Sequence, residues 1–305
     1  MPDPALRPVC RTEVIAVSFT FHRPRSFQEV LDLLEGLGEG TVLLAGGTDL
    51  LVQMERQIIA PKHVVSLQDV AGLNQISTDS RGLHLGAMVT HRELEKSPRF
   101  RGSLAGLSEA CATVGGVQVR NLGTVGGNLV NASPAADTPP ALLCLDATVT
   151  AVGRSGEREL PLDRFFPGYR RTALRPGEVL TAIHIPPVEP RTGTAFFKLG
   201  RRRAMEISVA CSAARLTLAE DGRTIREARI ALGAVAPTAI RSREAESMLS
   251  GRQADEKLFH EAGRAAGAEA QPIDDLRASA DYRRKVTAVL VSRALTACLE
   301  RVRGQ

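Results

Sequence analysis

The two stretches AGGTD, residues 45–49, and TVGGN, residues 124–128, decide the fold prediction. Each stretch holds a Gly-Gly pair close to a threonine. Because glycine tolerates positive φ and has no Cβ, backbone N–H groups at such a pair can converge into a concave nest for an anion. The threonine hydroxyls and the amide of Asn128 add neutral donors. The two stretches together therefore indicate a diphosphate-binding site, for a nucleotide that the spacing alone leaves unspecified.

The first stretch lies in an alternation of strand and helix patterns that predicts a small β-α-β-α-β unit. The expected elements are a strand at 19–21, a helix from Ser26, a strand at 42–44, a helix at 49–56 and a strand at 64–67. Glu29, three residues after Ser26, predicts a capping box at the start of the first helix.

The second stretch belongs to a second unit of the same kind. The expected elements are a strand at 83–88, a helix opened by a Thr90–Glu93 capping box, helices at 103–112 and from Asp137, and a strand at 147–152. Five glycines among residues 115–128 argue against a regular helix or a packed strand there. We expect each Gly-Gly turn at a strand–helix junction of its own unit.

Three prolines within residues 186–190 mark a linker to a different kind of domain. Beyond it we expect strands at 194–199, 207–218 and 225–235, with a turn at Asp221-Gly222, and helices at 239–249, 254–267 and 282–301. The expected fold class is α+β. Two small α/β subdomains, about 13–70 and 71–188, form one domain, and residues 189–303 form a C-terminal domain with a three-stranded antiparallel sheet and helices.

Composition excludes several classes of protein. With 43% hydrophobic and 24% charged residues, the 305-residue chain is typical of soluble globular proteins. Its charges are interleaved, its net charge is only +5 and it has no tryptophan, so we expect no nucleic-acid surface. No apolar run suggests a membrane span, and residues 1–11, with three prolines, do not resemble a secretory signal, so we expect a cytoplasmic protein.

Short motifs narrow the chemistry further. The five cysteines are widely spaced without a CxxC pair, so neither a disulfide framework nor a zinc site is expected. The sequence contains no GxxxxGK[ST], GxGxxG, HExxH or GxSxG motif. The six histidines are scattered, and we expect them at surface or packing positions. No catalytic residue and no metal ligand is predicted in this chain.

The two glycine stretches resemble those of a known family. Five further segments share the resemblance: residues 22–24 (HRP), 118–121 (QVRN), 131–142 (NASPAADTPPAL), 198–207 (KLGRRRAMEI) and 275–283 (DLRASADYR). The family is the FAD-binding medium subunit of the molybdenum hydroxylases, such as carbon monoxide and xanthine dehydrogenases. The resemblance covers nearly the whole chain beyond about Ser18. It implies a vanillyl-alcohol oxidase-like (PCMH-type) FAD-binding domain at 13–188 and a C-terminal domain of the carbon monoxide dehydrogenase flavoprotein type at 189–303.

The resemblance implies a role for each of fourteen residues in holding FAD. Those that wrap the pyrophosphate are Ala45, Gly46, Gly47, Thr48, Asp49, Thr124, Val125, Gly126, Gly127 and Asn128. Asp137 bonds the polar middle of the cofactor, or is simply a helix N-cap. Leu180 packs near the adenine and Lys198 lies near the flavin ring. Ile207 lies over one flavin face, or is ordinary strand core. The triplet Arg201–Arg203 faces solvent, a partner, the flavin or an incoming dinucleotide.

The resemblance also implies partners. A large subunit holds the molybdenum cofactor and a small subunit holds two [2Fe-2S] clusters, in a dimer of heterotrimers. The chain takes electrons from these clusters and passes them through FAD to NAD⁺ or another acceptor. Two alternatives stay open: a free-standing FAD-dependent oxidase, and a non-catalytic assembly protein of the same fold. The substrate of the complex is not encoded in this chain.

Overall fold

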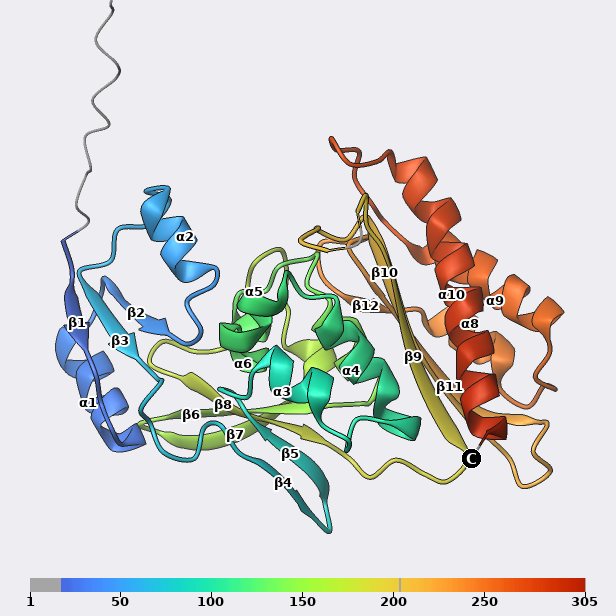
Figure 1. Cartoon of the computed structure of the whole chain (residues 1–305), viewed down its shortest axis with the longest axis horizontal. Helices are drawn as coiled ribbons and strands as arrows, with labels where there is room; N and C mark the ends of the chain where they lie inside the picture. The colour runs from blue at the N-terminus through green and yellow to red at the C-terminus, as the bar shows by residue number, and fades with distance from the viewer. Residues whose placement is uncertain (1–17, 203, 305) are drawn as a thin grey trace, which may run out of the picture.

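The computed structural model describes residues 18–202 and 204–304, which form three sheets with associated helices (Figure 1). A small three-stranded sheet lies at one end of the long axis, a five-stranded sheet lies in the middle and a four-stranded sheet lies toward the other end. A group of short helices separates the last two sheets.

The N-terminal unit has the predicted β-α-β-α-β order. Its elements are β1 (Thr20–His22), α1 (Phe27–Leu37), β2 (Thr41–Leu44), α2 (Leu50–Glu55) and β3 (His63–Ser66). The strands are parallel in the order β1-β3-β2. The capping box at Ser26 is only half formed, because the Glu29 carboxylate accepts from the backbone N–H of Arg25, 2.9 Å away, instead of from Ser26.

The middle unit is built on an antiparallel sheet. Its strands are β4 (Ile76–Asp79), β5 (Gly82–Gly86), β6 (Thr148–Gly153), β7 (Gly156–Pro161) and β8 (Val179–Ile185), in the order β4-β5-β8-β6-β7. The sequence prediction missed β4, β7 and β8. Most side chains of β4 and β7 are not buried, because these strands lie at the two sheet edges, so they lack an apolar pattern. The sequence prediction also missed the central strand β8, although most of its side chains are buried.

Short helices cover this sheet. They are α3 (His91–Lys96), the 3₁₀ turn η1 (Gly102–Leu104), α4 (Ala105–Ala112), α5 (Val117–Leu122), α6 (Val125–Val130) and α7 (Thr138–Cys144). A second 3₁₀ turn, η2 (Leu162–Arg164), follows β7. The capping box of Thr90 and Glu93 is complete.

The expectation that residues 115–128 exclude helix was wrong. Two six-residue helices, α5 and α6, occupy most of this segment, and Gly126-Gly127 lies in the first turn of α6. Tertiary packing explains the glycines, because a Cβ on Gly126 would lie 2.6 Å from the carbonyl oxygen of Ala87. The second Gly-Gly pair therefore follows a helix–helix junction and not a strand–helix junction.

The C-terminal part is an antiparallel sheet covered by helices on one face (Figure 1). It contains β9 (Thr192–Leu199), β10 (Ala210–Leu218), β11 (Ile225–Gly233), β12 (Ile240–Arg241), α8 (Arg243–Leu249), α9 (Glu256–Glu269) and α10 (Ala280–Arg303). The predicted three strands are present, and the two-residue β12 adds a fourth where the sequence suggested the start of a helix. Ile207 lies before β10, so the strand-core alternative for this residue was wrong.

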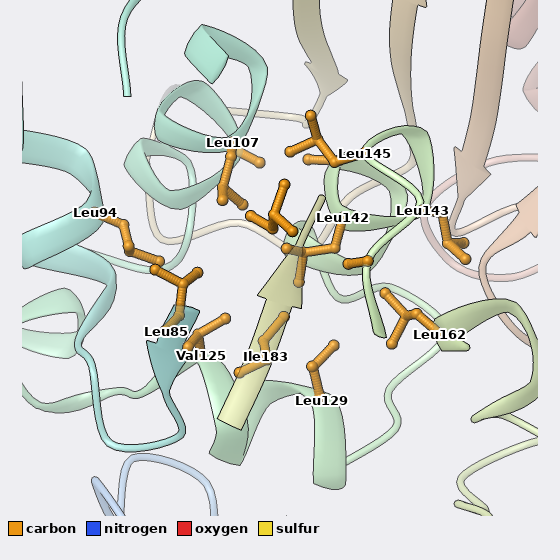
Figure 2. Packing of buried hydrophobic residues seen from close by; sticks show 14 of the residues in the cluster. Leu85, Leu94, Leu107, Val125, Leu129, Leu142, Leu143, Leu145, Leu162 and Ile183 are labelled. Atoms are coloured by element: carbon orange, nitrogen blue, oxygen red, sulfur yellow. The ribbon is translucent and has the colours of Figure 1, made fainter. Parts of the chain in front are cut away.

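The largest hydrophobic cluster joins the middle and C-terminal parts. Figure 2 shows Leu85, Leu94, Leu107, Leu142 and Ile183 converging between sheet and helices. The same cluster includes side chains from β9, β10 and β11, so α4 and α7 are packed between two sheets. This shared core fixes the position of the C-terminal sheet relative to the glycine-rich helices.

Cysteines contribute to this core as small hydrophobes, as predicted. Cys111, Cys144, Cys211 and Cys298 are buried and unpaired, whereas Cys10 lies outside the described residues. Burial raises the pKa of each of these four thiols, which makes them unreactive. Within residues 18–202 and 204–304, no helix combines the length and apolar character needed to cross a bilayer.

Candidate functional site

A cavity of about 310 Å³ brings the two glycine stretches together. Of the residues predicted to bind the cofactor, Ala45, Gly46, Gly47, Thr48, Asp49, Thr124, Gly126, Gly127, Asn128 and Leu180 line it. The lining also includes the apolar residues Leu43, Leu67, Leu174, Val179 and Leu180. The cavity lining therefore contains both polar groups and apolar side chains, as pockets for small ligands usually do.

The two stretches are in direct contact. A Cβ on Gly46 would lie 1.9 Å from the carbonyl oxygen of Leu122 and 2.9 Å from the Cα of Gly123. A Cβ on Gly127 would lie 3.5 Å from the Cβ of Ala45. Glycine at position 46 is thus required by close approach of the two backbones, and Gly47, with φ of 72°, is required by its conformation.

The first stretch carries free backbone donors. Among the described residues, no acceptor faces the N–H groups of residues 46–49. The hydroxyl of Thr48 is exposed beside them and also has no partner in the described part of the chain. These groups match the anion nest that the sequence predicted.

The second stretch uses its backbone donors internally, which corrects the prediction of a second nest. The N–H of Val125 donates to Val89 O and that of Gly126 to Ala87 O, both at 2.9 Å, and the N–H of Gly127 donates to Thr124 Oγ1 at 3.0 Å. These bonds attach the stretch to residues 87–91. The side chain of Asn128 still offers an NH₂ group, because only its Oδ1 is engaged, by Thr138 Oγ1 at 2.6 Å.

Four predicted residues lie away from this cavity. Val125 is fully buried in the core. Asp137 and Lys198 form a buried ion pair, with Lys198 Nζ 2.6 Å from Asp137 Oδ2. Ile207 is half-exposed in the loop between β9 and β10.

Asp137 is the centre of a network that links the middle unit to the C-terminal sheet. Its Oδ1 accepts from Ser208 Oγ at 2.5 Å, and its Oδ2 accepts from Thr113 Oγ1 at 3.2 Å in addition to Lys198. Burial raises the pKa of this carboxyl, whereas Lys198 and the two hydroxyls favour its ionised form. Asp137 occupies the N-cap position of α7, as the alternative expected, but its side chain makes no capping hydrogen bond.

A second cavity, of about 390 Å³, adjoins the first. It is lined by Thr113, Lys198, Leu199, Gly200, Arg201, Arg202, Ala204 and Glu206. Val114 lines the first cavity and its chain neighbour Thr113 lines the second, so the two cavities border the same part of the chain. Arg202 donates to Met205 O at 3.1 Å and lies 3.2 Å from Glu206, whereas Arg203 is outside the described residues.

The comparisons with known proteins agree with this arrangement. Residues 17–188 match the family model described as the FAD binding domain in molybdopterin dehydrogenase, and residues 195–298 match the CO dehydrogenase flavoprotein C-terminal domain. The chain is 34% identical to the carbon monoxide dehydrogenase medium chain of Hydrogenophaga pseudoflava, over 94% of this chain and 99% of that protein. It is 30% identical to the putative xanthine dehydrogenase FAD-binding subunit XdhB of Escherichia coli K12, over 91% and 96%.

Solved structures give the same result. Carbon monoxide dehydrogenase from Hydrogenophaga pseudoflava superimposes with a TM-score of 0.89 over 93% of this chain and 98% of the other. Quinoline 2-oxidoreductase from Pseudomonas putida 86 superimposes with a TM-score of 0.86 at 30% identity, over 93% and 97%. The chain belongs to the FAD-binding medium subunits of the molybdenum hydroxylases. This confirms the resemblance seen in the sequence, and the relatives are FAD subunits of oxidoreductases.

Sequence reasoning missed two buried residues of this medium subunit. His91 is 2% exposed and lines the first cavity. Arg120 donates to Glu95 at 2.8 Å and to the carbonyl oxygen of Val114 at 3.2 Å, which holds that cavity wall in place. Arg120 lies in the QVRN segment that supported the family resemblance, whereas His91 had no signal beyond its place after a capping threonine.

The position of His91 predicts acid sensitivity of the medium subunit. Burial, with a smaller effect of the Arg120 charge, lowers the pKa of His91 to about 4, whereas an unfolded histidine titrates near 6.5. Between these values the unfolded chain binds more protons, so stability present above pH 6.5 is lost as the pH falls. We expect the free energy of unfolding to drop by about 2 kcal/mol between pH 7 and pH 5 from this group alone.

Denaturant titrations at both pH values check this expectation. The variant His91→Phe removes the titrating group and should show a pH dependence smaller by that amount. An unchanged pH dependence in the variant would mean that His91 titrates normally in the folded protein.

Proposed function

We propose that this chain holds FAD with the diphosphate between the two glycine stretches. The free N–H groups of residues 46–49 carry this proposal, since they are donors that nothing in the described part of the chain uses. Thr48 and the NH₂ group of Asn128 add neutral donors at the same place. The close approach of the two chain segments depends on the missing Cβ of Gly46, so the residues present fit the group.

The rest of the cofactor would use both cavities. The apolar lining residues that include Leu180 suit the adenine. The second cavity suits the flavin ring, because Lys198 lies in its wall and Ile207 lies in the loop that follows β9. Lys198 would stabilise negative charge on a reduced ring. Both oxygens of Asp137 already accept hydrogen bonds from protein groups, so we propose that it orients Lys198 instead of bonding the ribityl or ribose hydroxyls itself.

We further propose that the subunit is an electron relay. FAD supplies the exchange between one-electron and two-electron carriers, and the protein supplies binding and electrostatics. The titratable residues at the first cavity are consistent with this role: Asp49 is exposed, His91 is neutral, and Glu178 is paired with Arg158 at 2.6 Å. None of them forms an acid–base pair with another.

The proposed partners follow from the family. They are a large molybdopterin-binding subunit and a small subunit with [2Fe-2S] clusters, in a cytoplasmic dimer of heterotrimers, with NAD⁺ or another carrier as the final acceptor. Relatives named as medium chains and as lettered subunits of dehydrogenase complexes support a multi-subunit assembly. We also propose the domain limits 13–188 and 189–303, of which residues 13–17 lie outside the described part.

Purification of the full-length chain, alone and with the subunits that accompany it, tests the proposal. We expect about one FAD per chain and a flavin absorbance that dithionite bleaches. Partner subunits should be reoxidised by NAD⁺ or another carrier only when this chain is present. A chain that remains colourless with excess FAD in both preparations would refute the cofactor assignment. A chain that oxidises substrates alone would favour the free-standing oxidase instead.

A further inference from the structure

His91 occupies a defined position against the second glycine stretch. Its backbone N–H donates to Gly123 O at 3.0 Å, next to the bridge between Thr90 and Thr124. A Cβ on Gly123 would lie 3.3 Å from His91 Cδ2 and 3.3 Å from Thr48 Oγ1. The imidazole therefore lies at the junction of the two stretches, beside the hydroxyl of the first stretch.

The imidazole is not satisfied by the protein. Its Nδ1 is buried and has no hydrogen-bond partner among the described residues. An unpaired buried polar group costs about 1–3 kcal/mol, so a partner is expected from outside the chain. Two of the nearby polar groups are engaged elsewhere, since Arg120 binds Glu95 and carbonyl groups, and Thr124 accepts from Gly127. The Thr48 hydroxyl faces the same cavity and makes no bond to the ring. The ring lines the first cavity, and its Nε2 also has no partner among the described residues. Unlike Nδ1, Nε2 is not one of the fully buried unpaired atoms, so a ligand in the cavity can reach it.

We propose that His91 is a cofactor-binding residue whose imidazole donates a hydrogen bond to an oxygen of the FAD diphosphate. This proposal rests on the proposed function. Diphosphate oxygens only accept hydrogen bonds, so they pair with the single N–H of a neutral imidazole. Burial, with a smaller effect of the Arg120 charge, lowers the pKa of His91 and keeps the ring neutral without ligand. Arg120 itself is neutralised by Glu95.

Three substitutions at this position separate binding from packing. His91→Phe keeps a ring and removes both nitrogens. His91→Asn places an amide near the position of Nδ1, and His91→Gln places one near Nε2, which covers both orientations of the ring. His260→Phe is the matched control, because His260 is an exposed residue of α9 that does not line the cavity.

The measurements are the Kd for FAD and for ADP, and the Tm of the FAD-free protein, with the full-length chain purified together with its accompanying subunits. For His91→Phe we expect both Kd values to rise about tenfold or more, since one hydrogen bond to a charged group is lost. The Tm without FAD should stay constant or rise, because an unpaired polar group is removed. Either the asparagine or the glutamine variant should bind within a few-fold of wild type.

Several outcomes would overturn the proposal. Wild-type Kd values in His91→Phe would show that the ring makes no bond to the cofactor. A weaker Kd for FAD with an unchanged Kd for ADP would place the contact outside the diphosphate. A fall in Tm matching the loss of affinity, without rescue by either amide, would assign His91 a packing role. Failure of the wild-type protein to bind FAD would instead refute the proposed function, so the two failures are distinguishable.

Discussion

Replacing Gly46 by alanine should abolish FAD binding. The added Cβ would lie 1.9 Å from the carbonyl oxygen of Leu122 and 2.6 Å from its carbonyl carbon, and both are backbone atoms of the segment that leads into the second stretch. The two stretches must therefore separate, which moves the free N–H groups of residues 46–49 away from Thr124 and Asn128. We expect the Kd for FAD to rise by about 100-fold, since overpacking costs about 1–3 kcal/mol and a clash between backbone atoms lies at the upper end of that range.

The matched control is Gly36→Ala. Gly36 lies inside α1, and a Cβ there would meet nothing within 4 Å. The same substitution should then stabilise the protein by about 0.5–1 kcal/mol and leave FAD binding unchanged. FAD titration and thermal unfolding of both variants check the pair. Tight FAD binding by Gly46→Ala would show that the backbones at Gly46 and Leu122 are not in contact in the FAD-bound protein.

Gly46 also marks the limit of what the sequence could predict. A Gly-Gly pair signals that some Cβ is excluded, and its family motif identifies the cofactor. The atom that excludes the Cβ belongs to Leu122, 122 − 46 = 76 residues further along the chain, and no local pattern identifies it. For the same reason no local motif indicates that the N–H of Gly126 donates to Ala87 O. The sequence therefore predicts an anion nest where the structure has backbone hydrogen bonds between residues 87–89 and 125–126.

The sequence predicts local structure best where all the residues that form it are close together in the chain. The Thr90–Glu93 capping box needs only neighbouring residues, and it formed as predicted. At Ser26 the capping box is incomplete, because the Glu29 carboxylate accepts a hydrogen bond from the backbone N–H of Arg25 instead. The edge strands β4 and β7 escaped prediction because partner strands, not their own apolar pattern, stabilise them.

Within the site, the sequence predicted the residues but not their pairings. Asp137 and Lys198 were each assigned to the cofactor, and the structure binds them to each other across 61 positions. The sequence predicts only a surface or packing position for His91, as for the other histidines. Its burial beside the glycines depends on hydrogen bonds that join residues 89–91 to residues 123–125. Long-range contacts of this kind are set by tertiary structure and carry no short-range signature.

Replacing Lys198 by methionine should lower the free energy of unfolding by about 3–5 kcal/mol, because removing one partner of a buried ion pair leaves an uncompensated charge. Asp137 would keep only the hydroxyls of Ser208 and Thr113 as donors. The surface variant Lys285→Met is the matched control. Lys285 and Asp281 are both about three-quarters exposed, so that pair should contribute about 1 kcal/mol or less. Denaturant unfolding of both variants measures the difference.

The double variant Lys198→Met with Asp137→Asn separates folding from flavin chemistry. A neutral amide still accepts from Ser208, so most of the lost stability should return once the unpaired carboxylate is gone. If Lys198 also stabilises a negatively charged reduced flavin, the double variant should bind FAD but hold it at a lower reduction potential than wild type. Recovery of both stability and potential would restrict Lys198 to a structural role. Recovery of neither would mean that the Lys198–Asp137 contact is not the interaction that links the two parts of the protein.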